Sequence, residues 1–183
     1  MVKQEPLRSS SATSVDISIV IVSFNTASLL KRCLLSVRDS LSLSLQSQPA
    51  LSYEILVVDN ASSDGSADLV RREFSDVILI TNDVNRGFAA ANNQALSQAR
   101  GRFILLLNPD TEVRGEAITT MLTFLREHPR VGIVGCRLVY GDGSFQHSCF
   151  RFPNLLMTFF DHFPVNHRLT ESRLNGRYSR QQY

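Results

Sequence analysis

The sequence predicts an α/β fold in which a mostly parallel sheet is flanked by helices. Short apolar runs rich in Ile and Val alternate along the chain with longer stretches whose apolar residues recur at helical spacing. Continuous apolar runs are typical of strands buried on both faces, as in a parallel sheet. Their regular alternation with helices favours right-handed crossover connections between neighbouring strands.

Four strands and four helices are predicted in alternation. The strands are ISIVIVS, EILVVD, VILIT and FILLLN, at residues 17–23, 54–59, 77–81 and 102–107. The helices are predicted over residues 27–37, 66–74, 89–100 and 116–128, where apolar positions repeat on one face. The segment at 40–52 alternates Ser and Leu, and we interpret it as an extension of the first helix followed by a loop.

The pattern changes after Pro129. VGIVG at 131–135 predicts one more strand, RLVYGDGSFQ predicts a hairpin that turns at Asp142-Gly143, and a short helix is predicted to start near Pro153. We therefore divide the chain into a disordered lead at 1–15, one ligand-binding domain at 16–150, and a further segment at 151–183.

Composition excludes several classes of protein. The 183 residues suffice for one domain without a disulfide or metal staple, and the three cysteines have no zinc-ligand or disulfide spacing. The formal net charge of +2 gives no indication of a nucleic-acid partner. No apolar stretch approaches the roughly 20 residues of a membrane helix, so a cytoplasmic location is expected. The five Arg of residues 151–183 suit either a solvated face or contact with anionic lipid.

Polar residues follow each of the four predicted strands. They are Ser23-Phe24-Asn25, Asp59-Asn60, the stretch from Asn82 to Gly87, and Asn108-Pro109-Asp110. Ligands of open α/β sheets bind outside the carboxyl ends of the strands, so these residues mark a candidate site. The glycine motifs of dinucleotide-binding folds and of P-loops are absent from the sequence.

Four blocks of sequence resemble a known family. ISIVIVSFN, EILVVDNASSDGS, NDVNRGFAAANN and FILLLNPDTEV, in this order, resemble the family 2 glycosyltransferases, which have the Rossmann-like GT-A fold. Within that family the likeness is greatest to the bacterial rhamnosyltransferase-like group, and it continues to about Asn154. It implies that residues 16–150 form a nucleotide-sugar-binding domain and that residues 151–183 are the start of a truncated acceptor-side region. The resemblance implies an inverting enzyme that transfers a sugar, with rhamnose suggested, from a dTDP- or UDP-linked donor. It also implies a polysaccharide or lipid-linked acceptor in cell-surface glycan synthesis, with peripheral contact at the inner face of the plasma membrane.

The resemblance also implies roles for individual residues in donor binding. Asp59 would accept hydrogen bonds from the base or ribose with Asn60 beside it, and Arg86 would approach the base or the diphosphate. The remaining residues of the implied donor site are Ser23, Phe24 and Asn25, which line the base pocket, together with Asn93 and Asn108.

A divalent metal is implied as well. Asn108-Pro109-Asp110 occupies the place of the family's D-x-D motif, which makes Asp110 the expected ligand of Mg²⁺ or Mn²⁺. Such ions are commonly held by one or two carboxylates together with substrate phosphates. The first position of the motif is an amide here.

Each of these residues also has a purely structural interpretation. Asp59 and Asn60 suit caps of the following helix, and Asp110 suits a turn after Pro109. Arg86 suits a surface position. Asn is a poor helix former, so Asn92 and Asn93 require compensation, either from a ligand or from a packed amide. For Asp64 and Ser66 we expect helix capping.

No catalytic residue is identified. Inverting transfer needs a general base, and in the resembled family this base is a carboxylate in a later acidic motif. Among the carboxylates that remain downstream, Glu112, Glu116, Asp142, Asp161 and Glu171 lack that context. We therefore expect a truncated chain whose base lies beyond its end. The alternative to a transferase is a non-catalytic nucleotide-sugar-binding remnant.

Overall fold

A computed structural model describes residues 15–47, 51–148 and 152–163 of the chain. The chain divides into two compact units, Met1–Gly132 and Ile133–Tyr183. The lead expected at residues 1–15 falls outside the described residues except for Val15, as does the later part of the segment expected at 151–183.

The first unit contains the predicted alternation of strands and helices. The strands are β1 (Ile17–Ser23), β2 (Tyr53–Asp59), β3 (Ile78–Thr81) and β4 (Phe103–Leu107). The helices are α1 (Ala27–Ser47), α2 (Ser66–Glu73), α3 (Phe88–Leu96) and α4 (Ala117–Glu127). The α/β prediction is confirmed, and α1 runs into the Ser/Leu segment as expected. Helix α3 ends earlier than predicted, in a turn where Ser97 Oγ donates a hydrogen bond to the Gln94 carbonyl (2.7 Å).

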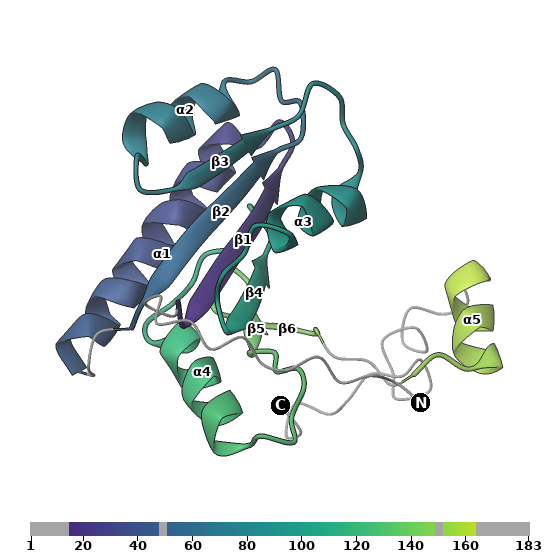
Figure 1. The fold of residues 1–183 in the computed structure, drawn as a ribbon. Helices are drawn as coiled ribbons and strands as arrows, with labels where there is room; N and C mark the ends of the chain where they lie inside the picture. Colours follow the sequence, from purple (N-terminus) through teal and green to yellow (C-terminus); the bar gives the residue numbers. More distant parts are fainter. Residues whose placement is uncertain (1–14, 48–50, 149–151, 164–183) are drawn as a thin grey trace, which may run out of the picture. The chain divides into compact units, whose positions relative to one another are not determined.

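The four strands form one parallel sheet in the order β3-β2-β1-β4 (Figure 1). Ile17 of β1 lies opposite Tyr53 on one side and Phe103 on the other. At the other end of the sheet, Ser23 lies opposite Asp59, which lies opposite Thr81. Because the strands are parallel and aligned, the loops that follow them emerge at one edge, which we call the carboxyl edge.

Helices cover the two faces of this sheet unequally. On one face, α1, α2 and α4 pack on a large cluster that contains Ile19, Ile21 and Phe74, while on the other face α3 packs Ala91 and Ala95 against β1 and β2 (Figure 1). The α3 helix is short, so Ile104 and Leu106 of the edge strand β4 remain 43% and 52% exposed.

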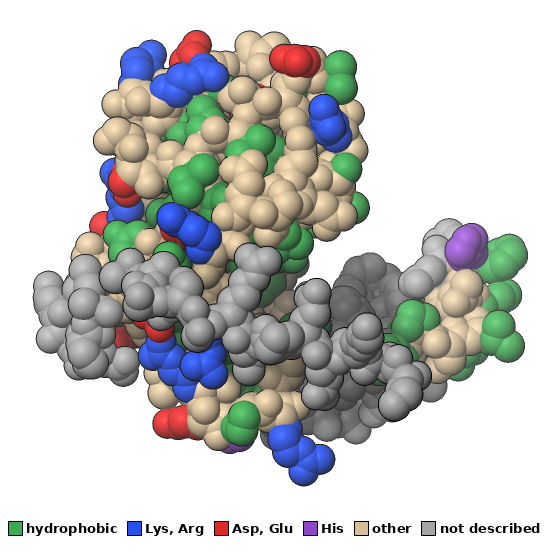
Figure 2. All heavy atoms as spheres, viewed as in Figure 1, with side chains coloured by type: hydrophobic (Ala, Val, Ile, Leu, Met, Phe, Trp, Pro, Cys, Tyr) green, Lys and Arg blue, Asp and Glu red, His purple; other side chains and the backbone are tan. Residues whose placement is uncertain are grey.

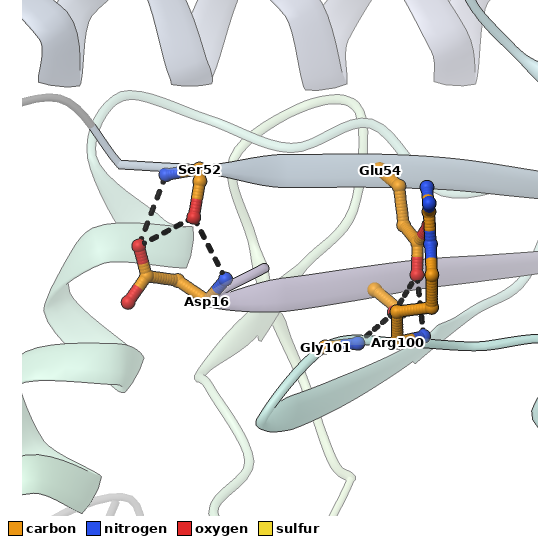
Figure 3. A network of polar contacts seen from close by, with 6 residues as sticks. Asp16, Ser52, Glu54, Arg100 and Gly101 are labelled. Carbon is orange, nitrogen blue, oxygen red and sulfur yellow. Dashed lines mark hydrogen bonds and ion pairs between the residues drawn. The ribbon is translucent and has the colours of Figure 1, made fainter. Parts of the chain in front are cut away.

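A polar network closes the opposite, amino edge of the sheet (Figure 3). The buried Glu54 carboxylate accepts hydrogen bonds from Ser18 Oγ (2.6 Å) and Arg100 N (2.6 Å), and pairs with the Arg100 guanidinium (2.8 Å). Gly101 N donates to Ser18 Oγ (2.8 Å). Beside this network, Asp16 accepts hydrogen bonds from the backbone and the hydroxyl of Ser52. These polar groups are satisfied within the protein, so they mark a structural edge.

The described part of the second unit contains a hairpin and a helix. Strands β5 (Leu138–Val139) and β6 (Phe145–Gln146) pair antiparallel, and Gly143 in the turn has a φ of 82°, which confirms the hairpin. Helix α5 (Leu155–His162) starts after Asn154, whose side chain accepts hydrogen bonds from the first turn. Its apolar side chains include Leu155 and Phe159, which are exposed. Hydrophobic side chains of this helix are visible at the surface in Figure 2.

The prediction of a strand at residues 131–135 is wrong. These residues have no strand structure, and Ile133 is 91% exposed. A strand requires a hydrogen-bonded neighbour, and the described residues provide none for this glycine-containing segment. None of the described helices is both long and apolar enough to span a bilayer.

Candidate functional site

The structure brings the residues that follow the four strands to the carboxyl edge. Ser23 and Asp59 end neighbouring strands in register, and Asn108 follows β4 on the other side of β1. Backbone hydrogen bonds extend this alignment into the loops, because Asn60 N donates to the Ser23 carbonyl (2.8 Å) and Asn82 N to the Asp59 carbonyl (2.9 Å).

The loops after β1 and β2 are joined by reciprocal hydrogen bonds. Asn25 has a left-handed φ of 53° that is tolerated by Asn better than by most residues. Its Oδ1 accepts a hydrogen bond from Ser63 N (2.8 Å), and its own backbone N donates to Ser62 Oγ (3.0 Å). The Asn25 side chain therefore holds the second loop, and its predicted contact with a base stays a prediction.

Asp64 caps two helices from this second loop. One carboxylate oxygen accepts a hydrogen bond from Ala27 N of α1 (2.7 Å), and the other accepts from Ser66 N of α2 (3.1 Å). The capping predicted for Asp64 is thus confirmed. The prediction that Ser66 caps a helix is wrong, because its hydroxyl donates to Asp64 (2.5 Å), and its own amide also donates to that carboxylate.

One carboxylate oxygen of Asp59 has no hydrogen-bond partner in the protein. The residue is only 3% exposed, and its Oδ2 accepts a hydrogen bond from Ser62 N (3.0 Å). Its Oδ1 is buried and has no partner; among the described residues this is otherwise true only of Ser148 Oγ, in the second unit. A buried unpaired acceptor costs about 1–3 kcal/mol, so helix capping alone does not account for Asp59 at this position.

Asn60 is buried beside Asp59 but directs its side chain to the loop after β3. Its Oδ1 accepts hydrogen bonds from Arg86 N (3.0 Å) and Asn82 Nδ2 (3.1 Å). Its Nδ2 donates to Asn85 Oδ1 (2.7 Å) and makes a longer contact with the Gly87 carbonyl (3.5 Å). Asn60 therefore organises the segment that carries Arg86.

The residues of α3 separate into a packed amide and an exposed one. Asn92 is buried and its Nδ2 donates to the Phe88 carbonyl (2.9 Å), which is the packed-amide interpretation. Asn93, the one included among the predicted donor-binding residues, is exposed, as is Arg86 before the helix. Their contact with a donor stays a prediction.

Ser23 and Phe24 lie at the end of β1. Ser23 is fully buried and its hydroxyl shares a hydrogen bond with Thr26 Oγ1 (2.8 Å), whereas Phe24 is 46% exposed. Of the two, only Phe24 presents an apolar surface to solvent against which a planar base can stack.

Asn108-Pro109-Asp110 forms a turn that is fixed from within. The Asn108 carbonyl accepts hydrogen bonds from Thr111 N (3.2 Å) and Thr111 Oγ1 (2.8 Å), and the Cys33 thiol of α1 lies 3.6 Å from it. Burial, together with the negative charges of Asp110 and Glu112, raises the pKa of Cys33 to about 12. The side chain of Asp110 itself is exposed.

The carboxyl edge suits a metal ion only when a phosphorylated ligand binds together with it. The described residues contain no group of three or more His, Cys, Asp or Glu side chains placed to hold an ion. One exposed carboxylate fits Mg²⁺ or Mn²⁺ when substrate phosphates complete the shell, as these ions commonly require. The donor set therefore fits a metal that binds together with a phosphorylated ligand.

Two of the downstream carboxylates, Glu112 and Asp142, have structural partners. Glu112 forms an exposed ion pair with Arg32 (3.5 Å), and Asp142 accepts a hydrogen bond from Ser144 N (2.8 Å) in the hairpin turn. The side chain of Asp161 and all of Glu171 fall outside the described residues.

Sequence reasoning missed the residues that shape the loops. Asn82 and Gln94 form a reciprocal amide pair (2.8 and 2.9 Å), and Asn82 also bonds to Asn60. The concentration of Asn between residues 82 and 93 was a signal, but which amides pair depends on how β3 and α3 are placed.

Comparisons with known proteins show the family and the fold. The sequence profile described as Glycosyl transferase family 2 matches residues 18–173. A poly(ribitol-phosphate) beta-glucosyltransferase from Bacillus spizizenii is 34% identical over 116 residues, which cover 61% of this chain and 17% of that protein.

Two solved structures share the fold. A mannosyltransferase from Pyrobaculum calidifontis, in complex with GDP-Man and Mn²⁺, superimposes with a TM-score of 0.51 at 26% identity over 60% of this chain and 32% of its own. TarS 1–349 from S. aureus, in complex with UDP-GlcNAc, gives 0.51 at 25% identity over 62% and 32%. The chain thus spans about a third or less of each of these proteins.

Proposed function

The chain belongs to glycosyltransferase family 2, and from that premise we propose that its carboxyl edge binds a nucleotide-diphosphate sugar and serves sugar transfer to a glycan or lipid-linked acceptor. The observation that carries this proposal is the unpaired Asp59 Oδ1. A buried acceptor at the end of a central strand suits an N–H group of a pyrimidine base or a hydroxyl group of a ribose.

The proposed donor lies across the ends of β2, β1 and β4. Phe24 offers an exposed ring for the base, and Arg86 supplies a cation for the base or the diphosphate. The solved relatives hold UDP-GlcNAc in one case and GDP-Man in the other, which supports a nucleotide-sugar ligand. A dTDP-linked rhamnosyl donor rests on the sequence resemblance alone.

We further propose that Asp110 holds Mg²⁺ or Mn²⁺ jointly with the donor diphosphate. Such an ion neutralises the negative charge that develops on the departing diphosphate. The Mn²⁺ in the mannosyltransferase complex supports this proposal. The turn that carries Asp110 is set by Thr111, so the carboxylate is displayed at the edge before any ligand arrives.

The same proposal includes inverting chemistry, a cytoplasmic location and activity at the inner face of the plasma membrane. They are supported by the family and by a relative named for a polymer of ribitol phosphate. The alternative function, a nucleotide-sugar-binding remnant without its base, is supported by the structural partners that occupy Glu112 and Asp142.

Calorimetric titration tests the metal part of the proposal. UDP-GlcNAc and dTDP-rhamnose are titrated into the chain with and without Mn²⁺, using the wild type, Asp110→Asn and, as control, Glu127→Gln. Both variants remove one exposed carboxylate, but only Asp110 lies at the carboxyl edge. We expect Mn²⁺ to strengthen donor binding about tenfold or more in the wild type and the control, and to have no effect on Asp110→Asn.

The opposite result, an equal Mn²⁺ effect in all three proteins, would remove Asp110 from the metal site. A transfer assay with dTDP-rhamnose and a lipid-linked acceptor extract then separates the two functions. Turnover by the chain as it stands would exclude the remnant and contradict the expectation that the base lies beyond its end.

A further inference from the structure

Asn60 is the most extensively bonded side chain of the carboxyl edge, and all of the observed partners of that side chain belong to the loop from Asn82 to Gly87. It is 2% exposed and engages both of its polar atoms there. An amide side chain offers two donor hydrogens and two acceptor lone pairs. With Arg86 N, Asn82, Asn85 and the longer Gly87 contact counted, Asn60 has no group left for a ligand.

The orientation of these amides follows from backbone groups, which cannot exchange donor for acceptor. Arg86 N is a donor, so the Asn60 atom that faces it is the oxygen. Gly87 N is likewise a donor, so the Asn85 atom at 2.8 Å from it is an oxygen, and the Asn60 atom facing that oxygen is the nitrogen. The assignment is thereby internally consistent.

The same logic extends to α3. Because Asn60 Oδ1 also accepts from Asn82 Nδ2, the nitrogen of Asn82 is fixed, and its oxygen faces Gln94 Nε2 (2.9 Å). Asn82 Nδ2 donates in turn to Gln94 Oε1 (2.8 Å). The amides of Asn60, Asn82 and Gln94 therefore connect the end of β2 to α3, across the loop that carries Arg86. We call these three residues the amide relay.

We propose that Asn60 is a positioning residue, and that the amide relay holds the Arg86 loop in its binding conformation before the ligand arrives. This inference rests on the proposed function, because it assigns Arg86 to a nucleotide diphosphate. Binding strengthens when the contacting group is already held in place, since less conformational entropy is lost on association. Asn60 thus acts on affinity through Arg86, while its neighbour Asp59 touches the ligand.

A double-mutant cycle distinguishes positioning from direct contact. UDP and dTDP are titrated by calorimetry into the wild type, Asn60→Ala, Arg86→Ala and the double variant, with Gln98→Ala as a control at an exposed amide beyond α3. We expect Asn60→Ala to weaken binding about tenfold when Arg86 is present and less than about twofold when it is absent. Equal losses in both backgrounds would show that Asn60 contacts the ligand itself, and would overturn the proposal.

Amide hydrogen exchange provides a readout that needs no ligand. In the wild type the Arg86 amide is protected by Asn60 Oδ1, so Asn60→Ala should accelerate its exchange, while Gln98→Ala should not. Gln94→Ala is a second variant that breaks the relay at its far end without opening the strand end, and it should show the same effects to a smaller degree. Unchanged exchange at Arg86 in Asn60→Ala and Gln94→Ala would overturn the relay.

The two readouts keep the two proposals apart. If neither UDP nor dTDP binds the wild type, the proposed function fails, and the proposal that Asn60 positions a diphosphate contact fails with it. Amide hydrogen exchange at Arg86 still decides whether the amide relay holds the loop. If the nucleotides bind and the cycle is additive, only the positioning role fails.

Discussion

Asp59 combines a structural cost with a proposed binding role. Its carboxylate is buried, yet one oxygen has no hydrogen-bond partner in the protein. Proteins rarely leave a buried acceptor in this state, and the exceptions concentrate at functional sites. The neighbouring Ser23, Asn60 and Asp64 are all bonded within the protein, so the open acceptor is specific to this residue.

The substitution Asp59→Asn tests whether this residue lowers stability while contributing to ligand binding. Its amide oxygen can still accept from Ser62 N, while its nitrogen replaces the open acceptor by a donor. We expect thermal stability to stay within about 1 kcal/mol of the wild type or to rise, while affinity for UDP or dTDP falls about tenfold or more. Unfolding scans and calorimetric titration measure the two effects. Retained affinity would show that the ligand does not use this oxygen.

Among the elements, β4 starts next to a glycine that has no room for a side chain. Gly101 precedes this strand, and a Cβ placed on it would lie 2.3 Å from Ser18 N and 2.7 Å from the Ile17 carbonyl carbon. Both obstacles are backbone atoms of the central strand, so they cannot move aside without disturbing β1. The first residue of β4 and the amino edge therefore depend on a glycine at this position.

We expect Gly101→Ala to destabilise the fold by about 3 kcal/mol or more, because an overpacked site displaces backbone and also strains the hydrogen bond from Gly101 N to Ser18. Gly132→Ala is the matched control, since its Cβ would meet no atom within 4 Å. Urea unfolding of both variants provides the measurement. Equal midpoints for the two would contradict this account of the close approach.

The elements were predictable to different degrees. The strands of the sheet could be predicted because continuous apolar runs such as β1 and β2, bounded by polar loop residues, favour strands buried on both faces. The segment at 131–135 is a shorter apolar run. A strand there would need a neighbouring strand to pair with, and the sequence pattern does not indicate whether one is present. The strand order could not be predicted either, because the local sequence pattern of a strand does not indicate that β4 pairs with β1.

The location of the candidate site could be predicted, but the hydrogen bonds among its side chains could not. Topology alone placed Asp59, Asn60 and Asn108 at one edge. Which of them faces a ligand depends on side-chain partners elsewhere in the loops, such as Ser62 for one residue and Arg86 for the next. Two adjacent residues of similar size thus have different hydrogen-bond partners, which residue type alone could not separate.

For the whole molecule, the amino-edge network makes stability depend on pH. Burial alone would raise the pKa of Glu54, but hydrogen bonds from Ser18 and Arg100 and the charge of Arg100 hold it below its ordinary value of 4.5. The pKa of Asp16 is lowered too, chiefly by its backbone hydrogen bond from Ser52. A carboxylate with a lowered folded-state pKa contributes stability that is complete above the ordinary value and is lost as the pH falls through the folded-state value.

We therefore expect the free energy of unfolding to decline as the pH drops below 4.5, with Glu54 as a main contributor. Glu54→Gln should lose about 2 kcal/mol at neutral pH, since it breaks a buried charged contact, and its decline in acid should be shallower. Chemical unfolding at a series of pH values measures both. Glu127→Gln, which removes an exposed carboxylate, serves as control, and an acid decline identical in Glu54→Gln and the wild type would refute the assignment.

The order β3-β2-β1-β4 also has a consequence for the growing polypeptide. During synthesis, β1 can pair with β2 and β2 with β3 as soon as residues through Thr81 have left the ribosome, but Ile17 must wait for Phe103 before its second side is covered. Until then β1, which is buried along its whole length in the finished sheet, is an edge strand whose unpaired backbone N–H and C=O groups are open to other chains. The nascent domain therefore needs protection most during the interval in which α3 leaves the ribosome.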